Sequence, residues 1–116
     1  MSQSKTPPLY MLSTIKVRPG KMGDFCALMP QVVAIVEAQG WRLVGAFTHL
    51  GGRLNVVLDL WQIPDANALP SGIGALIAAR DWPAISRGLA DYVEDEFLQL
   101  MTKLPFDLGR IPEHLG

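Results

Sequence analysis

The chain has 116 residues, which is the usual length of a single domain. It carries 10 Lys and Arg against 11 Asp and Glu, and this formal net charge of −1 argues against a protein that binds nucleic-acid phosphates. Hydrophobic residues make up 49% and charged residues 18%, so the chain is expected to build a packed core rather than stay disordered.

Neither a membrane span nor a secretory signal is expected. The longest uncharged stretch, 66–79, is interrupted by Pro70 and Gly72, whereas a spanning helix needs about 20 consecutive apolar residues. Residues 1–8 lack the apolar segment of a secretory signal. Cys26 is the only cysteine, lies in an apolar run and is expected to be a buried packing thiol. We therefore predict a cytoplasmic protein with no disulfide and no membrane partner.

A strand and a helix are predicted first, after a flexible tail at residues 1–8. β-Branched and apolar residues favour a strand over 10–17, which the turn at 18–20 ends. Over 21–38, apolar residues recur at spacings of three and four, which predicts an amphipathic helix that Gly40 terminates. The apolar stripe of this helix consists of Met22, Phe25, Cys26, Met29, Val32, Val33 and Val36.

Two further strands, 41–50 and 54–63, flank Gly51-Gly52, a strong signal for a β-hairpin. A two-residue loop at these glycines pairs Phe47 with Val56. One face of the hairpin is then almost wholly apolar and is predicted to lie under helices. Its members are Trp41, Leu43, Gly45, Phe47, His49, Leu54, Val56, Leu58, Leu60 and Gln62. The other face is mixed and carries Arg42, Val44, Ala46, Thr48, Asn55, Val57, Asp59 and Trp61.

Two helices and one ambiguous segment complete the chain. A short helix is predicted over 71–80, and a second begins after Asp81 as its N-cap and continues to residue 92. The segment 94–104 fits either a continued helix or a strand with alternating faces. Residues 107–116 are expected to form a C-terminal tail, so the folded domain spans 9–106.

Most familiar chemical motifs are missing from the sequence. It contains no phosphate loop, dinucleotide-binding turn or nucleophile elbow. The chain has 2 histidines, His49 and His114, so neither a zinc site nor another metal or cofactor is expected. The acidic run at 91–96 is interpreted as the solvated end of an element, with a hard-cation or acid–base site as the alternative.

The mixed face of the hairpin is the leading candidate for a site. Trp61 shares it with Arg42 and Asp59, and a cavity there, joined by Tyr10, would hold a small, largely apolar ligand. Alternatively, Arg42 and Asp59 pair across a dimer interface in which Trp61 simply packs. His49, beside the glycine turn, is either a rim residue or a general base or haem ligand.

The predicted order of strand, helix, strand, strand, helical region and strand is that of the ferredoxin-like split βαβ fold. Several stretches within it resemble the NIPSNAP family, and together they extend from Tyr10 to Phe106. They are the turn and helix start VRPGKMGDF at 17–25, the hairpin motifs LVGAF at 43–47, Gly52, NVV at 55–57 and LW at 60–61, and the landmarks DWP at 81–83 and LPF at 104–106.

The resemblance implies an α+β fold whose four-stranded antiparallel sheet meets the sheet of a second copy to close a dimeric α/β barrel. It also favours the strand interpretation of 94–104. The wider superfamily includes cofactor-independent monooxygenases, haem-degrading enzymes and small cyclases or isomerases. Asp59 stands where the family often has a histidine, and 66–79 lacks the expected arginine-rich helix, so no catalytic role is transferred.

Burial arguments favour a homodimer independently of that resemblance. The helices can cover only one face of the sheet, which leaves an apolar patch that a two-fold homodimer commonly covers. The residues expected on this exposed face are Leu12, Val44, Ala46, Val57, Trp61, Phe97 and Met101.

Two functional hypotheses follow, beside a structural homodimer without a ligand. The first is a homodimer that binds a small, largely apolar molecule between the sheet and the first helix, lined by Tyr10, Arg42, His49, Asp59 and Trp61. The second is a cofactor-independent monooxygenase or isomerase acting on a small aromatic or enolisable substrate. There, His49 or Asp59 would be the base that takes a proton.

Overall fold

The structure, a computed structural model, describes residues 7–106. The predicted C-terminal tail at 107–116 and residues 1–6 of the predicted N-terminal tail lie outside this range. In chain order the elements are β1 (Leu9–Val17), α1 (Met22–Glu37), β2 (Arg42–Thr48), β3 (Val56–Ile63), α2 (Ala68–Ala78), α3 (Trp82–Tyr92) and β4 (Val93–Met101).

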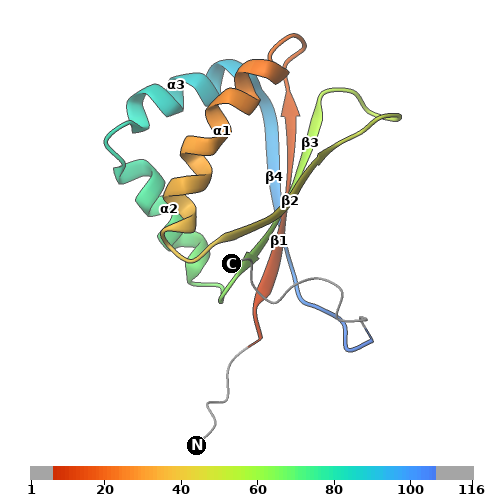
Figure 1. Ribbon diagram of the computed structural model, residues 1–116, viewed down its shortest axis with the longest axis vertical. Helices are drawn as coiled ribbons and strands as arrows, with labels where there is room; N and C mark the ends of the chain where they lie inside the picture. The colour runs from red at the N-terminus through yellow and green to blue at the C-terminus, as the bar shows by residue number, and fades with distance from the viewer. Residues whose placement is uncertain (1–6, 107–116) are drawn as a thin grey trace, which may run out of the picture.

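The four strands form one antiparallel sheet in the spatial order β2-β3-β1-β4. The helices α1, α2 and α3 all lie on one side of this sheet (Figure 1). This arrangement is the predicted α+β, ferredoxin-like fold. The segment 94–104, which the pattern alone left open, lies largely in the edge strand β4. None of the helices formed by residues 7–106 is long and apolar enough to cross a membrane.

The chain turns where the sequence predicts, at glycines with positive φ angles. Gly20 follows β1 with a φ of 83°, and Gly40 follows α1 with a φ of 99°. A side chain with a Cβ is strained in this conformation, which explains why glycine stands at both positions.

Trp41 and Trp61 organise one half of the core. Their ring centroids lie 5.2 Å apart, with the planes at 77° to each other. The indole Nε1 of Trp41 donates a hydrogen bond of 2.6 Å to the carbonyl oxygen of Ala68 at the start of α2. Gly72, one turn further along, lets the backbone of α2 approach the Trp41 ring, because a Cβ at this position would collide with it.

The predicted register of the β2–β3 hairpin is wrong. Phe47 pairs with Leu58 rather than Val56, because residues 49–55 form a longer loop than predicted. A bulge between Leu43 and Gly45 then shifts the pairing of Arg42 and Leu43 by one residue. The signal at Gly51-Gly52 correctly indicated a turn but did not fix its length. Between Gly45 and Thr48, each residue of β2 pairs with a residue of β3 that lies two positions beyond the predicted partner. Because side chains alternate with a period of two, this shift leaves each of these residues on the same face as the partner predicted for it.

The predicted cover of the two sheet faces is correct for Trp41 and Leu43, which pack against the helices, but it is reversed for β3 and for β2 after its bulge. Asp59 and Trp61, from the face interpreted as mixed, are 3% exposed and lie on the helix side of the sheet. We call the opposite side the open face. It carries the apolar side chains of Leu12, Phe47, Leu58, Leu60, Phe97 and Met101. The reversal has a simple cause: β3 is apolar on both faces, so alternation alone cannot tell which face the helices cover.

The patch predicted for the exposed face is therefore only partly correct. Leu12, Phe97 and Met101 lie on the open face, whereas Val57 and Trp61 are buried on the helix side. The open face nevertheless exposes large apolar side chains, because Phe47 is 60% exposed and Phe97 is 55% exposed.

Cys26 is also misplaced by the predicted helix stripe. It is exposed on α1, whereas Phe25, Val32 and Val36 are the buried residues of this helix. Cys26 satisfies the three-and-four spacing, but the stripe that faces the sheet is centred on Phe25. The large aromatic ring occupies the buried position, and the small thiol is left in solvent.

Candidate functional site

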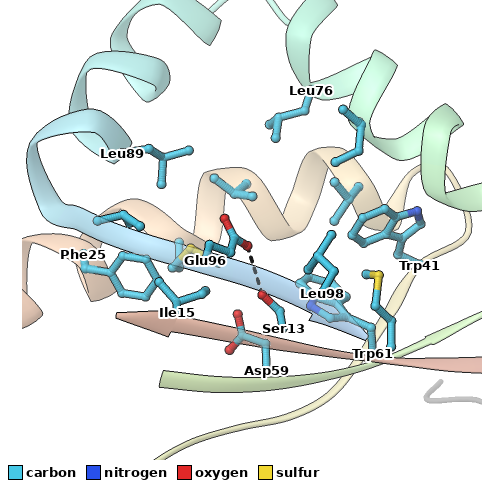
Figure 2. Close-up of a pocket in the computed structure, with 16 residues that line it drawn as sticks. Ser13, Ile15, Phe25, Trp41, Asp59, Trp61, Leu76, Leu89, Glu96 and Leu98 are labelled. Atoms are coloured by element: carbon cyan, nitrogen blue, oxygen red, sulfur yellow. Dashed lines mark hydrogen bonds between the residues drawn. The ribbon is translucent and has the colours of Figure 1, made fainter. Parts of the chain in front are cut away.

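A cavity of about 110 Å³ lies between the sheet and the helices (Figure 2). β1, β3 and β4 form its floor, and all three helices contribute to its roof. All but three of its lining residues are apolar. The lining consists of Met11, Ser13, Ile15, Phe25, Met29, Val32, Val36, Trp41, Asp59, Trp61, Ile73, Leu76, Leu89, Val93, Glu96 and Leu98.

The three polar lining residues come from three neighbouring strands. Ser13 on β1 pairs with Asp59 on β3, and Glu96 on β4 pairs with Ile15, two positions along β1. Figure 2 shows the three side chains gathered together, with Ser13 between the two carboxyl groups. The Ser13 Oγ donates a hydrogen bond of 3.0 Å to the Oε2 of Glu96.

Asp59 is the buried carboxyl group of this cluster. Burial in the apolar cavity disfavours its charged form, and the negative charge of Glu96 adds to the effect. Together they raise the pKa of Asp59 from 3.8 to about 6. A carboxyl group in this range can gain and lose a proton near neutral pH, as general acids and bases must.

The lining of the cavity is most exposed along α2 and β4. Its most exposed lining residues come from these two elements: Ile73 is 38% exposed and Leu98 is 41% exposed. Glu96, also exposed, lies on the same strand as Leu98. Glu96 therefore lies at the exposed edge of the cavity, and the buried Asp59 lies deeper inside.

The structure does not bring the five residues predicted for the site together, and four of them are divided between the two sides of the sheet. Asp59 and Trp61 line the cavity. Tyr10 and Arg42 lie on the open face, in register with Gln62, and the Tyr10 hydroxyl accepts a hydrogen bond of 3.1 Å from Gln62 Nε2.

His49 lies apart from both groups, in the exposed loop between β2 and β3. Its Nδ1 is 3.0 Å from the carbonyl oxygen of Arg53. The imidazole contributes to a separate hollow lined by Thr14, Lys16, His49, Arg53, Val56, Leu58, Asp95 and Phe97.

Ser13 and Glu96 belong to the cavity but were not selected from the sequence. Ser13 is a lone small polar residue at an inward position of β1, between Met11 and Ile15. Glu96 alternates with Leu98 on β4, which was the available signal that one acid of the run at 91–96 faces inward. The interpretation of 91–96 as a solvated end is therefore wrong for Glu96, which lines the cavity.

No cluster of His, Cys, Asp and Glu suited to a metal ion occurs within residues 7–106. The cavity lining also contains no histidine and no cysteine. Its polar chemistry is therefore that of two carboxyl groups and one hydroxyl.

The NIPSNAP family model matches residues 10–107, which is most of the chain. The chain belongs to the NIPSNAP family. No curated protein matches it in sequence.

Solved structures share the NIPSNAP fold at low sequence identity. A NIPSNAP family protein with unknown function from Agrobacterium tumefaciens is 18% identical, with a TM-score of 0.75, over 87% of this chain and 92% of that one. An uncharacterized NIPSNAP domain protein from Burkholderia xenovorans is 23% identical, with a TM-score of 0.71, over 85% and 97% of the two chains.

A more distant neighbour is a protein from Bacteroides thetaiotaomicron that carries the name of an antibiotic biosynthesis monooxygenase. It is 22% identical, with a TM-score of 0.59, over 86% of this chain and 90% of that one. At these identities the likeness concerns the fold alone.

Proposed function

We propose that this NIPSNAP protein binds a small, largely apolar molecule in the cavity between its sheet and its helices. The observation that carries this proposal is an apolar cavity with one buried carboxyl group, Asp59, on its wall. Ligand sites combine an apolar lining with a few placed polar groups in the same way.

The size of the cavity limits the ligand. Its volume is about 110 Å³, and an engineered apolar cavity of about 150 Å³ binds benzene in another protein. A molecule with one ring or a short branched chain is therefore the expected size class. The side chains of Phe25, Trp41 and Trp61 provide aromatic surface for such a body.

Toluene is a suitable first probe because it has the expected size and no polar group. Titration with toluene is expected to shift the methyl NMR signals of Ile15, Leu76 and Leu89, which line the cavity. Leu76→Trp fills the cavity and should abolish these shifts. Ile77→Trp, at the exposed neighbouring position of α2, should retain them.

Absence of saturable shifts in the wild-type protein would contradict the binding proposal, and so would equal binding by the two tryptophan variants. The wild-type titration remains decisive if Leu76→Trp does not fold.

A second candidate function is proton transfer by Asp59, favoured by its pKa of about 6 in an apolar cavity. Its carboxylate would take a proton from the carbon beside a carbonyl group, and the C–H electron pair would form the enolate. Isomerases and cofactor-independent monooxygenases begin with such a step, and a fold neighbour carries a monooxygenase name.

Exchange of the α-hydrogens of cyclohexanone for deuterium in D2O tests this candidate. The protein should accelerate exchange, and the rate should rise with pH through about 6 because only the ionised Asp59 acts as a base. Asp59→Asn should return the rate to that of solvent. Unchanged exchange in this variant would reject the role of Asp59.

We also propose that the protein is a homodimer in a reducing, cytoplasmic compartment. The open face supports the dimer, because its Phe47 is 60% exposed and its Phe97 is 55% exposed. The unpaired, exposed thiol of Cys26 is suited to a reducing compartment. The cavity is lined by a single chain, so ligand binding and dimerisation are separate proposals.

A further inference from the structure

The two carboxyl groups are the only charge-bearing groups on the cavity wall. No Lys, Arg or His belongs to its lining, so nothing there compensates a negative charge. Lys21, a basic residue of the helix layer, forms an ion pair with Asp91, 3.5 Å away. The cavity is therefore apolar in its bulk and acidic at one position on its floor.

Asp59 has no hydrogen-bond donor in the described part of the chain. Ser13 is the cavity's only hydroxyl, and its single proton is donated to Glu96 over 3.0 Å. Asp59 is only 3% exposed and receives no hydrogen bond from residues 7–106. No fully enclosed side-chain oxygen or nitrogen of these residues lacks a partner, so the oxygens of Asp59 face the open space of the cavity. A buried carboxylate without a donor is costly, so the site as folded leaves room for a donor brought by a ligand.

A protonated amine on a hydrocarbon body complements both features. An ammonium group supplies a positive charge and several N–H donors, which two neighbouring carboxyl groups can share. The aromatic rings of Trp41 and Trp61 add a favourable environment for a cation. A carboxylate or phosphate ligand would instead be repelled by Asp59 and Glu96.

We propose that the cavity selects small hydrophobic amines, bound as ammonium ions at Asp59 and Glu96. This inference rests on the proposed function, since it names the ligand class of the same cavity. The hydrocarbon part lies among the apolar lining residues, and the ammonium group donates to the carboxylate of Asp59.

Four one-ring probes of similar shape test the inference by calorimetry at pH 7.5: benzylamine, benzyl alcohol, toluene and benzoate. Benzylamine is expected to bind at least about tenfold more tightly than benzyl alcohol and toluene, because hydrogen bonds to charged groups are the stronger ones. Benzoate is expected not to bind.

Variants locate the preference at the two carboxyl groups. Asp59→Asn should reduce benzylamine affinity to that of benzyl alcohol, and Glu96→Gln should reduce it partly. Asp95→Asn is the matched control, because Asp95 neighbours Glu96 on β4 but pairs with Lys16 and points to the open face. Its benzylamine affinity should equal that of the wild-type protein.

The preference should also depend on pH. Asp59 is the lining residue with a raised pKa, and benzylamine stays protonated between pH 5 and pH 7.5. Lowering the pH from 7.5 to 5 protonates Asp59, whose pKa is about 6. This change should lower the affinity for benzylamine and leave the affinity for toluene unchanged.

Toluene or benzoate binding as tightly as benzylamine would overturn this inference and leave the binding function in place. The inference would also be overturned, with the binding function left in place, if Asp59→Asn and Glu96→Gln both kept the preference for benzylamine over benzyl alcohol and toluene. Failure of all four probes to bind would overturn the inference together with the proposed function.

Discussion

At the scale of single residues, Asp59 is the most informative position. It lies on a strand among apolar neighbours and is almost fully buried, and the negative charge of Glu96 acts on it. Such a residue weakens the fold when it is ionised, since its charge is removed from water without a compensating partner. A group that costs stability in this way is a sign of function rather than of packing.

The cost should be visible in the pH dependence of stability. The unfolded chain releases the Asp59 proton near pH 3.8 and the folded chain near pH 6, so between these values the folded state binds more protons. The free energy of unfolding contributed by this group therefore falls as pH rises through that window, by about 3 kcal/mol in total. Below about pH 3.8 Asp59 is protonated in both states and does not lower the free energy of unfolding. Above about pH 6 it is ionised in both states, and the full destabilisation is present.

Asp59→Asn should remove this decline, as measured by urea unfolding from pH 4 to pH 7. The stability of the variant relative to the wild-type protein should rise across the window. Asp81→Asn, at an exposed position before α3, is the control and should show no such relative rise. A constant difference between Asp59→Asn and the wild type would show that Asp59 ionises normally in the fold.

Gly72 offers a second prediction at this scale. A Cβ at this position would collide with the Trp41 ring, whereas nothing lies within 4 Å of a Cβ at Gly74 in the same helix. Gly72→Ala should lower the free energy of unfolding by about 1–3 kcal/mol, as overpacking does. Gly74→Ala should be neutral or stabilising by up to about 1 kcal/mol. Equal effects in thermal unfolding would mean that α2 does not pack this closely.

At the scale of elements, the amphipathic helix α1 shows what periodicity can and cannot decide. The spacing correctly predicted a helix with one apolar side, and the observed bounds Met22–Glu37 agree closely with 21–38. Two overlapping stripes were available within it, one through Phe25 and one through Cys26. Only packing against the sheet selects the first, because a large ring gains more from burial than a thiol.

Two neighbouring substitutions on α1 test this selection. Phe25→Ala should lower the free energy of unfolding by about 3–5 kcal/mol, because it opens a hole in the core. Cys26→Ser should change it by no more than about 0.5 kcal/mol, as at other surface positions. The native protein should also react with a thiol reagent without unfolding. A protected Cys26 thiol would contradict the observed orientation of α1.

At the scale of the whole molecule, the sheet divides the protein into two unlike halves. The helix side encloses the cavity with Asp59, and the open face carries apolar side chains. Figure 1 shows α1, α2 and α3 together on the opposite side of the sheet from this face. Because the two sides are separated by the sheet, a partner on the open face would not occupy the cavity. The proposed dimer and the proposed ligand site can therefore be tested one at a time.

The proposed homodimer is tested by sedimentation of the wild-type protein and of Phe97→Glu. The wild type should sediment as a dimer, and the variant should raise the dimer dissociation constant at least about 30-fold. Ile77→Glu is the matched control, because Ile77 on α2 is also 55% exposed but lies in the helix layer. Toluene binding should persist in Phe97→Glu. A wild-type protein that remains monomeric at high concentration would contradict the proposal.

The sequence by itself determined the order of the elements, the α+β class and the family, because these depend on local signals. These signals are local, because each involves residues close together in the sequence: glycines at turns, the three-and-four spacing in α1 and the alternation in the strands. It also selected Asp59 and Trp61 for a site, because a carboxylate and an indole are unusual on an otherwise apolar strand.

Only the tertiary structure decided which face of the sheet the helices cover and which side chains meet beneath them. Alternation separates the two faces of β3 but does not say which is covered when both are apolar. The bulge and the longer hairpin loop set the register of β2 through pairing with another strand. Ser13, Asp59 and Glu96 belong to three strands distant in sequence, so their meeting depends on the order of strands in the sheet.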